Sequence, residues 1–223
     1  VADGALYGID RSTLASGQSP DPVLLSPPDQ AVGSYRIREL VYITEDPVTG
    51  DTLLLDKTND VYRYTRAGGW AMEIPAQPVP GQFPDPQLLT IQVKDGAVLA
   101  LDADLSHLWR ISPQRPVPAA YLRGSQLSAA VDMALVQDGG AAQVYLLSWD
   151  GTVKRTSIGT GGQVQTTALP VEPVQWPSQI YAEDGQLVVV DGETRTVRVY
   201  DRANMTQVGQ VIFRHPAMPR LRS

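Results

Sequence analysis

An apolar run that ends in aspartate recurs along the chain at a nearly constant interval. The runs are LYGID ending at Asp10, LLLD ending at Asp56, LALD ending at Asp102 and VVVD ending at Asp191, and VYLLS, ending at Ser148, takes the fourth place. The end positions 10, 56, 102, 148 and 191 are spaced by 46, 46, 46 and 43 residues. Short apolar runs bounded by turn signals such as Asp184-Gly185 predict antiparallel strands. The chain is therefore expected to repeat one strand-rich unit.

Three further segments accompany these runs. An apolar segment precedes the run at Leu40–Ile43, Leu88–Val93, Val131–Val136 and Gln179–Ala182. An arginine-containing segment follows it at Val61–Tyr64, Leu108–Ile111, Val153–Thr156 and Val197–Tyr200. A last segment lies at Val23–Leu25, Ala71–Ile74, Ala119–Leu122, Gln165–Leu169 and Gly209–Phe213. Four strands in a repeat of about 40–50 residues are typical of a β-propeller blade.

The two ends of the chain together complete one repeat. Residues 219–223 followed by 1–10 give PRLRS-VADGALYGID, which aligns over its whole length with PSQIYAEDGQLVVVD at 177–191. Pairing the C-terminal segment with the first strand would close a ring and remove its open edges. We therefore predict one all-β domain over 1–223, a five-bladed β-propeller with four-stranded antiparallel blades. The predicted blades are 216–223 plus 1–30, 36–75, 86–123, 128–170 and 177–213; the alternative is a fragment of a larger ring.

Proline and glycine mark the predicted connections. The proline-rich stretches 27–28, 75–86 and 113–118 are interpreted as loops between blades, and 159–163 as a hairpin tip or loop. Residues 125–133 have a helical composition, but the repeat places the end of this segment on a strand.

Charge and composition exclude several classes of partner. The net charge of −6 and the pI near 4.9 argue against nucleic acid or an anionic membrane surface. The absence of cysteine excludes disulfides and thiolate chemistry and is compatible with a place outside the cytoplasm, although a cytoplasmic location stays open. No run approaches the roughly 18 apolar residues of a membrane span. Without a signal peptide or an initiator methionine, the chain is expected to be a monomeric domain of a longer protein.

The segment PSQIYAEDGQLVVVDGETRTVRVYDRA resembles the repeats of NHL-type propellers, whose blades run proline, apolar strand, Asp-Gly, strand, aspartate and arginine-containing strand. The segments LLLDKTNDVYRYTRAGGW, VLALDADLSHLWRIS and AAVDMALVQDGGAAQVYLLSWDGTVKR are similar, more specifically, to propellers attached to bacterial PPM-type serine/threonine phosphatases. The resemblance covers essentially the whole chain. It implies an extracytoplasmic sensor or interaction domain within a larger bacterial signalling protein.

Two residue types recur with the repeat. The aspartates at 10, 56, 102 and 191 are predicted to stabilise turns by accepting hydrogen bonds from backbone N–H groups. A ring of carboxylates that binds a cation is the alternative, and Ser148 interrupts it. The arginines at 63, 110, 155 and 198 are predicted to pack their stems between blades while their heads meet carboxylates or solvent, with an anion-binding ring as the alternative.

The sequence gives little support for catalysis. His107 and His215 have no partner pattern typical of zinc or of a Ser-His-Asp triad, and no phosphate-binding loop is present. A propeller glycoside hydrolase or a calcium-dependent lactonase-like enzyme would need convergent carboxylates in the channel. The innermost strands offer Glu39, Asp132 and Glu183 for that purpose. We predict no catalytic residues, no metal and no cofactor.

Three residues are candidates for binding. Trp149 lies in a WDG turn that replaces the aspartate pattern, and we expect it to be exposed and to anchor a partner. Glu39 and Asp132 are the candidates for a ligand in the central channel. The predicted function is a non-catalytic scaffold that binds a ligand or a protein partner, and the alternative is a propeller enzyme that uses channel carboxylates.

Overall fold

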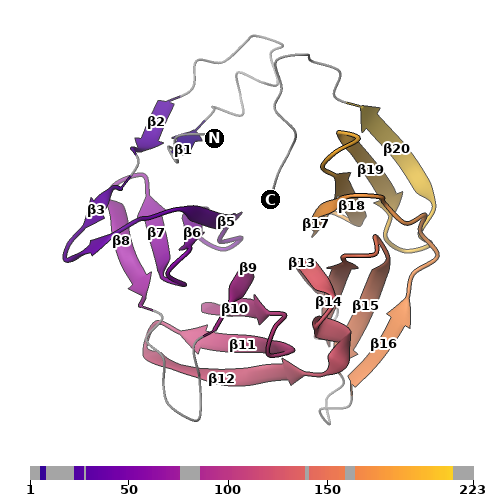
Figure 1. Ribbon diagram of the computed structural model, residues 1–223, viewed down its shortest axis with the longest axis horizontal. Helices are drawn as coiled ribbons and strands as arrows, with labels where there is room; N and C mark the ends of the chain where they lie inside the picture. Colours follow the sequence, from indigo (N-terminus) through magenta and orange to yellow (C-terminus); the bar gives the residue numbers. More distant parts are fainter. Residues whose placement is uncertain are drawn as a thin grey trace. The chain divides into compact units, whose positions relative to one another are not determined.

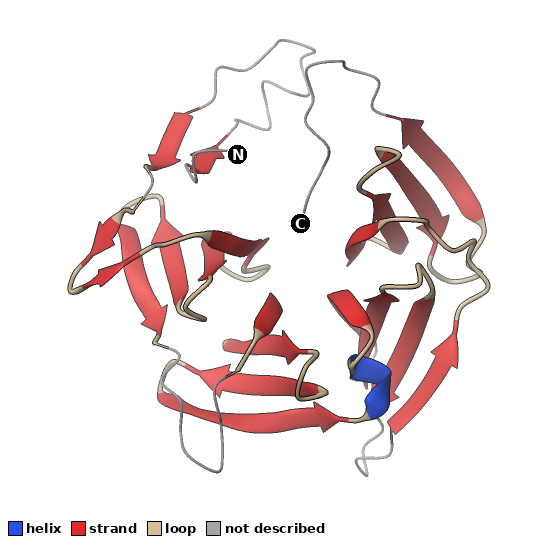
Figure 2. Cartoon of the chain, in the orientation of Figure 1, coloured by secondary structure: helices blue, strands red, loops and turns tan. Residues whose placement is uncertain are grey.

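The computed structural model describes residues 6–8, 23–27, 29–75, 86–138, 141–158 and 164–212. These residues form antiparallel strands joined by short turns (Figures 1 and 2). The chain divides into two compact units, Val1–Gln77 and Pro78–Ser223, which are described separately below. No helix in the described part of the chain is long and apolar enough to cross a membrane.

The first unit contains one four-stranded blade, here called blade A. Its strands are β5 (Leu40–Glu45), β6 (Thr52–Asp56), β7 (Val61–Thr65) and β8 (Gly69–Ile74), hydrogen-bonded in that order. Two small sheets precede it: β1 (Leu6–Gly8) with β2 (Val23–Ser26), and β3 (Ala31–Val32) with β4 (Tyr35–Arg36).

The β3–β4 hairpin, which the repeat did not predict, packs on blade A through a buried cluster of Val32, Ile37, Leu54 and Tyr62. Tyr62 donates its hydroxyl hydrogen to the carbonyl oxygen of Arg36 at 2.8 Å. Burial, together with the charges of Asp56 and Asp60, raises the pKa of Tyr62. The phenol therefore stays protonated and holds the hairpin in place.

The second unit contains three four-stranded blades. Blade B has β9 (Leu88–Lys94), β10 (Ala97–Asp102), β11 (His107–Ser112) and β12 (Arg115–Arg123). Blade C has β13 (Ala130–Asp138), β14 (Ala141–Ser148), β15 (Val153–Ile158) and β16 (Val164–Ala168). Blade D has β17 (Pro177–Glu183), β18 (Gln186–Asp191), β19 (Thr196–Asp201) and β20 (Gln207–Ile212). In each blade the strands pair in sequence order.

Strand β14 connects the cores on its two sides. Val144 and Leu146 belong to a buried cluster that includes Leu99 of blade B. Tyr145 and Leu147, which alternate with them, belong to a cluster that includes Leu187 of blade D. Because successive side chains of a strand point to opposite faces, a strand covered on both sides needs apolar residues at every position. Among the innermost strands of these three blades, β13 lies between β9 and β17 and contacts both (Figure 1).

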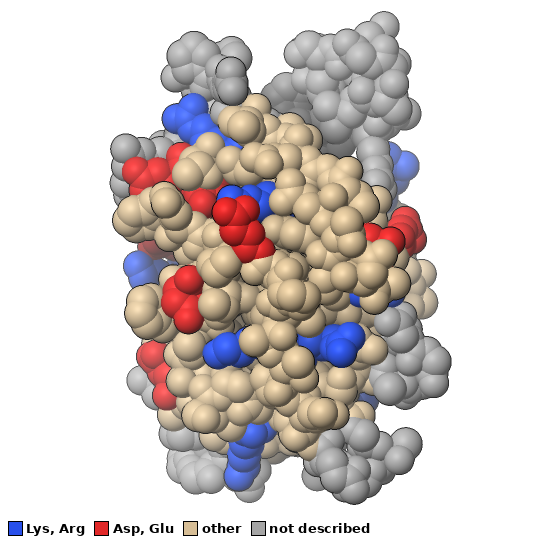
Figure 3. All heavy atoms as spheres, turned by 90° about the vertical axis from the view of Figure 1, so that its right-hand side faces the viewer, with Lys and Arg blue, Asp and Glu red and all other residues tan. Residues whose placement is uncertain are grey.

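The outermost strands β16 and β20 have the sequences VQTTA and QVGQVI, which contain no charged residue. All five residues of β16 and most of β20 are exposed. The side of the second unit that carries these strands is mostly uncharged, with scattered charges of both signs (Figure 3).

The predicted antiparallel four-stranded blades are confirmed, and their strands run from Leu40 to Ile74, Leu88 to Arg123, Ala130 to Ala168 and Pro177 to Ile212. The described residues contain four such blades, however, and not the five predicted. The repeat predicts that Val23–Leu25 forms the last strand of a blade. In the structure these residues belong to β2, which pairs directly with β1. The segments 1–5 and 213–223, on which the predicted closure depends, lie outside the described residues, as do the loop 159–163 and most of 75–86.

The sequence predicts a loop between two blades at 113–118, and this prediction is wrong. This stretch lies inside blade B, where it forms the turn after β11 and the first part of β12. Strand β12 is the outer edge of its sheet, so Pro116 and Pro118 occupy an edge strand, where proline is tolerated. The segment 125–133 behaves as predicted: a 3-10 turn at Ser125–Leu127 leads into β13 (Figure 2).

Candidate functional site

The aspartates that end the second strand of blades A, B and D stabilise the turn that follows. Oδ1 of Asp56 accepts a hydrogen bond from the N–H of Thr58 at 2.9 Å, and Oδ1 of Asp102 accepts one from Leu105 at 3.0 Å. Oδ1 of Asp191 accepts one from Thr194 at 3.0 Å. The predicted turn-forming role is therefore confirmed at these three positions, and Asp10 lies outside the described residues.

The second carboxylate oxygen fastens the segment that enters the blade. Oδ2 of Asp56 accepts from the N–H of Arg38 at 3.1 Å. Oδ2 of Asp191 accepts from Gln175 at 3.1 Å and from Trp176 at 3.4 Å. Burial opposes ionisation of Asp191, but these hydrogen bonds and that of Thr194 outweigh it and lower its pKa. One carboxylate thus joins both ends of the first hairpin of its blade.

Blade B lacks this second bond because of a proline. Asp56 pairs with Leu40, and Asp102 pairs with Leu88, so Pro86 takes the place that Arg38 has in blade A. Proline has no N–H to donate. Oδ2 of Asp102 is buried and has no hydrogen-bond partner within the described ranges.

Blade C replaces the aspartate with Ser148, and its WDG turn is built differently. Oδ1 of Asp150 accepts hydrogen bonds from the N–H of Thr152 at 3.0 Å and from its hydroxyl at 2.6 Å. The bonds from the Thr152 hydroxyl and N–H lower the pKa of Asp150. Gly151 has φ +81° and accepts a hydrogen bond from the N–H of Val174 at 3.2 Å. A Cβ at position 151 would lie 1.8 Å from the carbonyl oxygen of Val174, so the turn packs directly against the segment entering blade D.

Two exposed tryptophans lie close in sequence to this contact. The side chain of Trp149 is 70% exposed. Its backbone N–H donates to the carbonyl oxygen of Ala129, which directly precedes β13. Trp176 is 56% exposed, and its carbonyl oxygen accepts from the N–H of Gly192 just before β17. Both residues therefore lie at the end of the sheets where the innermost strands begin. Together with Leu105, exposed in the β10–β11 turn at the same end of blade B, they form what we call the tryptophan face.

The other two binding candidates already have partners in the structure. Glu39, in the first unit, forms an exposed ion pair with Lys57 at 2.7 Å. Asp132 is 1% exposed and lies on β13. Its Oδ1 accepts from its neighbour Met133, and its Oδ2 accepts from Ile180 of β17, both at 2.8 Å. Asp132 therefore joins the innermost strands of blades C and D.

The structure thus brings Trp149 into the same region as Trp176, a residue not selected from the sequence. Asp132 lies near the same end of blade C but is buried, and Glu39 belongs to the other unit. The roles of Trp149, Glu39 and Asp132 in binding remain predictions. Glu183, at the end of β17, accepts a hydrogen bond from the hydroxyl of Tyr181 at 2.5 Å.

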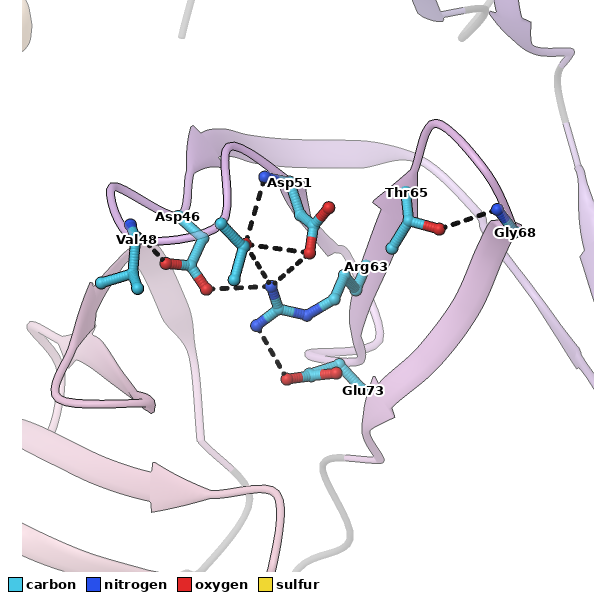
Figure 4. Close-up of polar contacts among 8 residues, drawn as sticks. Asp46, Val48, Asp51, Arg63, Thr65, Gly68 and Glu73 are labelled. Carbon is cyan, nitrogen blue, oxygen red and sulfur yellow. Dashed lines mark hydrogen bonds and ion pairs between the residues drawn. The ribbon is translucent and has the colours of Figure 1, made fainter.

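The recurring arginines have different environments. Arg63 lies among three carboxylates, with Nη1 at 2.9 Å from Asp46 and 3.1 Å from Asp51 and Nη2 at 3.0 Å from Glu73 (Figure 4). Burial opposes the charge of Arg63, but its bonds to Glu73 and Asp46 prevail and raise its pKa. The head of Arg63 therefore meets carboxylates, as the structural interpretation predicts.

The remaining arginines do not repeat this arrangement. Arg198 donates to Glu172. It pairs with Val189, two residues before the end of the second strand, whereas the other three arginines pair with the residue three before that end. The side chain of Arg198 therefore faces the opposite side of its blade. Arg110 is exposed. Arg155 lines a pocket, which is considered separately below.

The described residues offer no evident metal or histidine chemistry. No group of three or more histidine or acidic side chains among them is arranged to hold a metal ion. The ring of His107 stacks on Trp109, with centroids 4.7 Å apart and planes at 14°, and one of its nitrogens contacts the carbonyl oxygen of Leu105. His215 lies outside the described residues.

No protein-family model and no curated protein matches the sequence. Among solved structures, the chain is similar to a streptogramin B lyase, with 13% identity and a TM-score of 0.56 over 96% of this chain and 77% of that one. It is also similar to a chain of a nidogen/laminin complex, with 11% identity and a TM-score of 0.56 over 93% of this chain and 90% of that one.

A third similar structure is a catalytically inactive histidine-to-alanine variant of virginiamycin B lyase from Staphylococcus aureus with quinupristin. It shares 16% identity and has a TM-score of 0.53 over 92% of this chain and 63% of that one, so the chain spans less than two thirds of its length. These neighbours are β-propellers, and the similarity establishes a β-propeller fold for this chain. At this identity it establishes the fold alone, since both enzymes and non-enzymatic proteins share it.

Proposed function

We propose that this chain is a non-catalytic β-propeller scaffold that binds a protein partner through the tryptophan face. The observation that carries the proposal is the pair of exposed indoles, Trp149 and Trp176, each two residues from the Gly151–Val174 contact. Tryptophan is among the residues most enriched at the centres of protein interfaces, because it buries a large area with few rotatable bonds.

The backbone around these side chains is fixed before any partner arrives. Hydrogen bonds to Ala129 and Gly192 hold the main chain of the two tryptophans, and the Gly151–Val174 bond joins the two segments. A preorganised surface loses less conformational entropy on binding than a mobile one. This rigidity supports a docking role for the face.

The charges around the face favour a basic rim on the partner. The turns at this end of blades B, C and D carry the exposed side chains of Asp104, Asp150 and Glu193, which outnumber the two arginines there, Arg123 and Arg195. The chain as a whole has a net charge of −6. Opposite charges around an apolar centre speed association and select the partner. We therefore propose a partner that places an apolar patch on the tryptophans and lysine or arginine side chains beside the three acidic residues.

The proposal extends to a fifth blade and to the longer protein of which this chain would be a domain. The match between the chain ends supports a fifth blade completed by residues 216–223 and 1–30. The resemblance to propellers attached to PPM-type phosphatases supports a monomeric, extracytoplasmic sensor domain in a larger bacterial signalling protein. The engagement of Asp132 with two backbone N–H groups favours a non-catalytic role over an enzyme that uses channel carboxylates.

Site-specific photo-crosslinking in the full-length protein tests the docking role. A photoreactive phenylalanine analogue is placed at position 149 or 176 and, as matched controls, at the exposed positions Val164 and Val211. We expect one and the same protein to crosslink from 149 and 176 and not from the control positions. With that protein purified, Trp149→Ala and Trp176→Ala should each weaken binding by about tenfold or more.

Both side chains are exposed, so these substitutions should leave the melting temperature nearly unchanged. Equal crosslinking from the control positions, or undiminished affinity in the Trp149→Ala/Trp176→Ala double variant, would refute the docking role.

A further inference from the structure

A second candidate site lies at the other end of blades C and D. A pocket of 610 Å³ is lined on one side by residues of β14 and β15 and on the other by the β17–β18 and β19–β20 turns and β20. Its lining residues are Gln143, Tyr145, Arg155, Asp184, Gly185, Gln186, Asp201, Arg202, Ala203 and Val208. The tryptophan face lies at the opposite end of these strands, so the two sites are separate.

Arg155 is the distinctive group of this pocket. It is half-buried and lies directly opposite Tyr145 in the blade C sheet, and its side chain makes no hydrogen bond or ion pair within the described residues. Arg63 holds the same position relative to its second strand in blade A, and there three carboxylates neutralise it. In blade C, strands β14, β15 and β16 contain no aspartate or glutamate. The blade therefore gives the guanidinium of Arg155 no internal counter-ion from these strands.

Gln143, which lines the same wall as Arg155, can add a donor for an anion. Oε1 of Gln143 accepts the hydroxyl hydrogen of Tyr145 at 3.0 Å, which leaves the amide N–H₂ of Gln143 as a donor. An arginine fork can hold a carboxylate with two parallel hydrogen bonds. This side of the pocket is thus suited to the carboxylate of a ligand.

The opposite wall carries two carboxylates, Asp184 and Asp201, and one guanidinium, Arg202, so its net charge is negative. Asp184 lies in the β17–β18 turn with its side chain exposed and forms no hydrogen bond or ion pair within the described ranges. Oδ1 of Asp201 accepts from the N–H of Ala203 at 2.8 Å, which fixes the orientation of that carboxylate. The carboxylate of Asp184 would attract an ammonium group and repel a second negative charge on the ligand.

We propose that this pocket binds a small zwitterion, with its carboxylate on Arg155 and its ammonium group beside Asp184. The ligand chemistry is that of an α-amino acid or a short peptide with free ends. The volume lies within the roughly 300–1,000 Å³ typical of small-molecule sites. The two arginines and two aspartates of the lining balance in charge, which suits a ligand with no net charge.

Ligand-observed NMR followed by calorimetry tests the proposal with defined probes. The twenty free amino acids and the tripeptide Ala-Ala-Ala are titrated one by one, and any ligand found is compared with its C-amidated and N-acetylated forms. We expect at least one probe to bind with Kd below about 1 mM and each blocked form to bind at least about tenfold more weakly. Binding by free amino acids alone or by the tripeptide alone identifies the source, and either result supports the proposal.

Variants locate the ligand within the pocket. Arg155→Gln should weaken binding at least about tenfold, and Asp184→Asn should weaken it for the free ligand but not for its N-acetylated form. Arg110→Gln, at the equivalent and exposed position of blade B, serves as the matched control and should leave binding unchanged.

Three results would overturn the zwitterion site. They are the absence of binding by every probe up to about 10 mM, binding unaffected by Arg155→Gln, and equally tight binding of succinate or phosphate. The double variant Trp149→Ala/Trp176→Ala should bind the probes normally, so failure of the docking role and failure of this pocket are distinguishable.

Discussion

Asp191 illustrates how one ionised side chain secures a blade. Its two oxygens accept hydrogen bonds from Thr194 on one side and from Gln175 and Trp176 on the other. An ionised carboxylate only accepts hydrogen bonds, whereas protonation places an O–H donor on one oxygen and weakens its bonds from the N–H groups. The stability of blade D is therefore linked to the charge state of this residue.

Replacing Asp191 with asparagine should lower the free energy of unfolding by about 1–3 kcal/mol near neutral pH, because one oxygen becomes a donor facing N–H groups. The pKa of Asp191 is lowered in the folded state, so its contribution is complete above the unfolded pKa of about 4 and is lost as the pH falls through the folded value. The difference between wild type and Asp191→Asn should therefore shrink in acid. Urea unfolding at a series of pH values measures it.

Asp184→Asn provides the control for this experiment, because Asp184 makes no hydrogen bond within the described residues. Its effect on stability should be small at every pH. A difference between wild type and Asp191→Asn that stays constant down to about pH 2 would contradict the linkage.

Only the local half of this arrangement could be predicted from the sequence. Turn bonds from Asp56, Asp102 and Asp191 span two or three residues, so an aspartate after an apolar run indicates them directly. The bonds of the second oxygen join residues 15 to 18 positions apart. They depend on how the chain enters the blade, and for that reason they were missed.

The WDG turn is the element that fits blade C to the segment entering blade D. Gly151 and Gly185 both have positive φ, at +81° and +76°, but only Gly151 has a backbone atom within the reach of a Cβ. Comparing the two positions therefore separates backbone strain from steric contact.

Gly185→Ala should lower the free energy of unfolding by about 1–2 kcal/mol, the cost of a left-handed conformation for a residue with a Cβ. Gly151→Ala should cost at least about 2 kcal/mol more, because the turn must move away from Val174. Denaturant unfolding measures both. Equal losses in the two variants would show that the Gly151–Val174 contact adds nothing to stability.

The strands of the four blades could be predicted from the sequence because they recur with the repeat. Alternation and Asp-Gly turns located the blade strands to within a few residues, because these signals act over short distances. The β3–β4 hairpin was not predicted, since its two-residue strands lie outside the repeat and depend on packing against Tyr62. The 113–118 stretch was placed between blades because proline counts against a strand interior, a rule that relaxes at a sheet edge.

At the scale of the whole molecule, the proposed fifth blade makes the C-terminal residues part of the fold. If residues 219–223 pair with the N-terminal strand, removing residues 218–223 opens the ring and exposes strand edges. We expect this truncation to lower the free energy of unfolding by several kcal/mol and to increase aggregation. Thermal and urea unfolding of the truncated chain measure the effect, and an unchanged melting temperature would count against closure.

The candidate sites were less predictable than the fold because both depend on neighbouring blades. Trp149 was selected from its turn, but nothing local to Trp176 indicates that it lies near the segment bonded to Gly151. Arg155 looked equivalent to Arg63 in the repeat. Its environment differs because blade C provides no carboxylates from β14, β15 or β16 and because turns of blade D face it.

The exposure of Trp149 and Trp176 also gives the protein an optical reporter. Of its four tryptophans, Trp109 is 3% exposed, whereas these two are mostly in contact with solvent. Indole emission moves to shorter wavelength when water is removed from the ring. A partner that covers the two rings would therefore shift the intrinsic fluorescence of the unlabelled protein to the blue and protect it from iodide quenching, while a ligand in the Arg155 pocket would leave that signal almost unchanged.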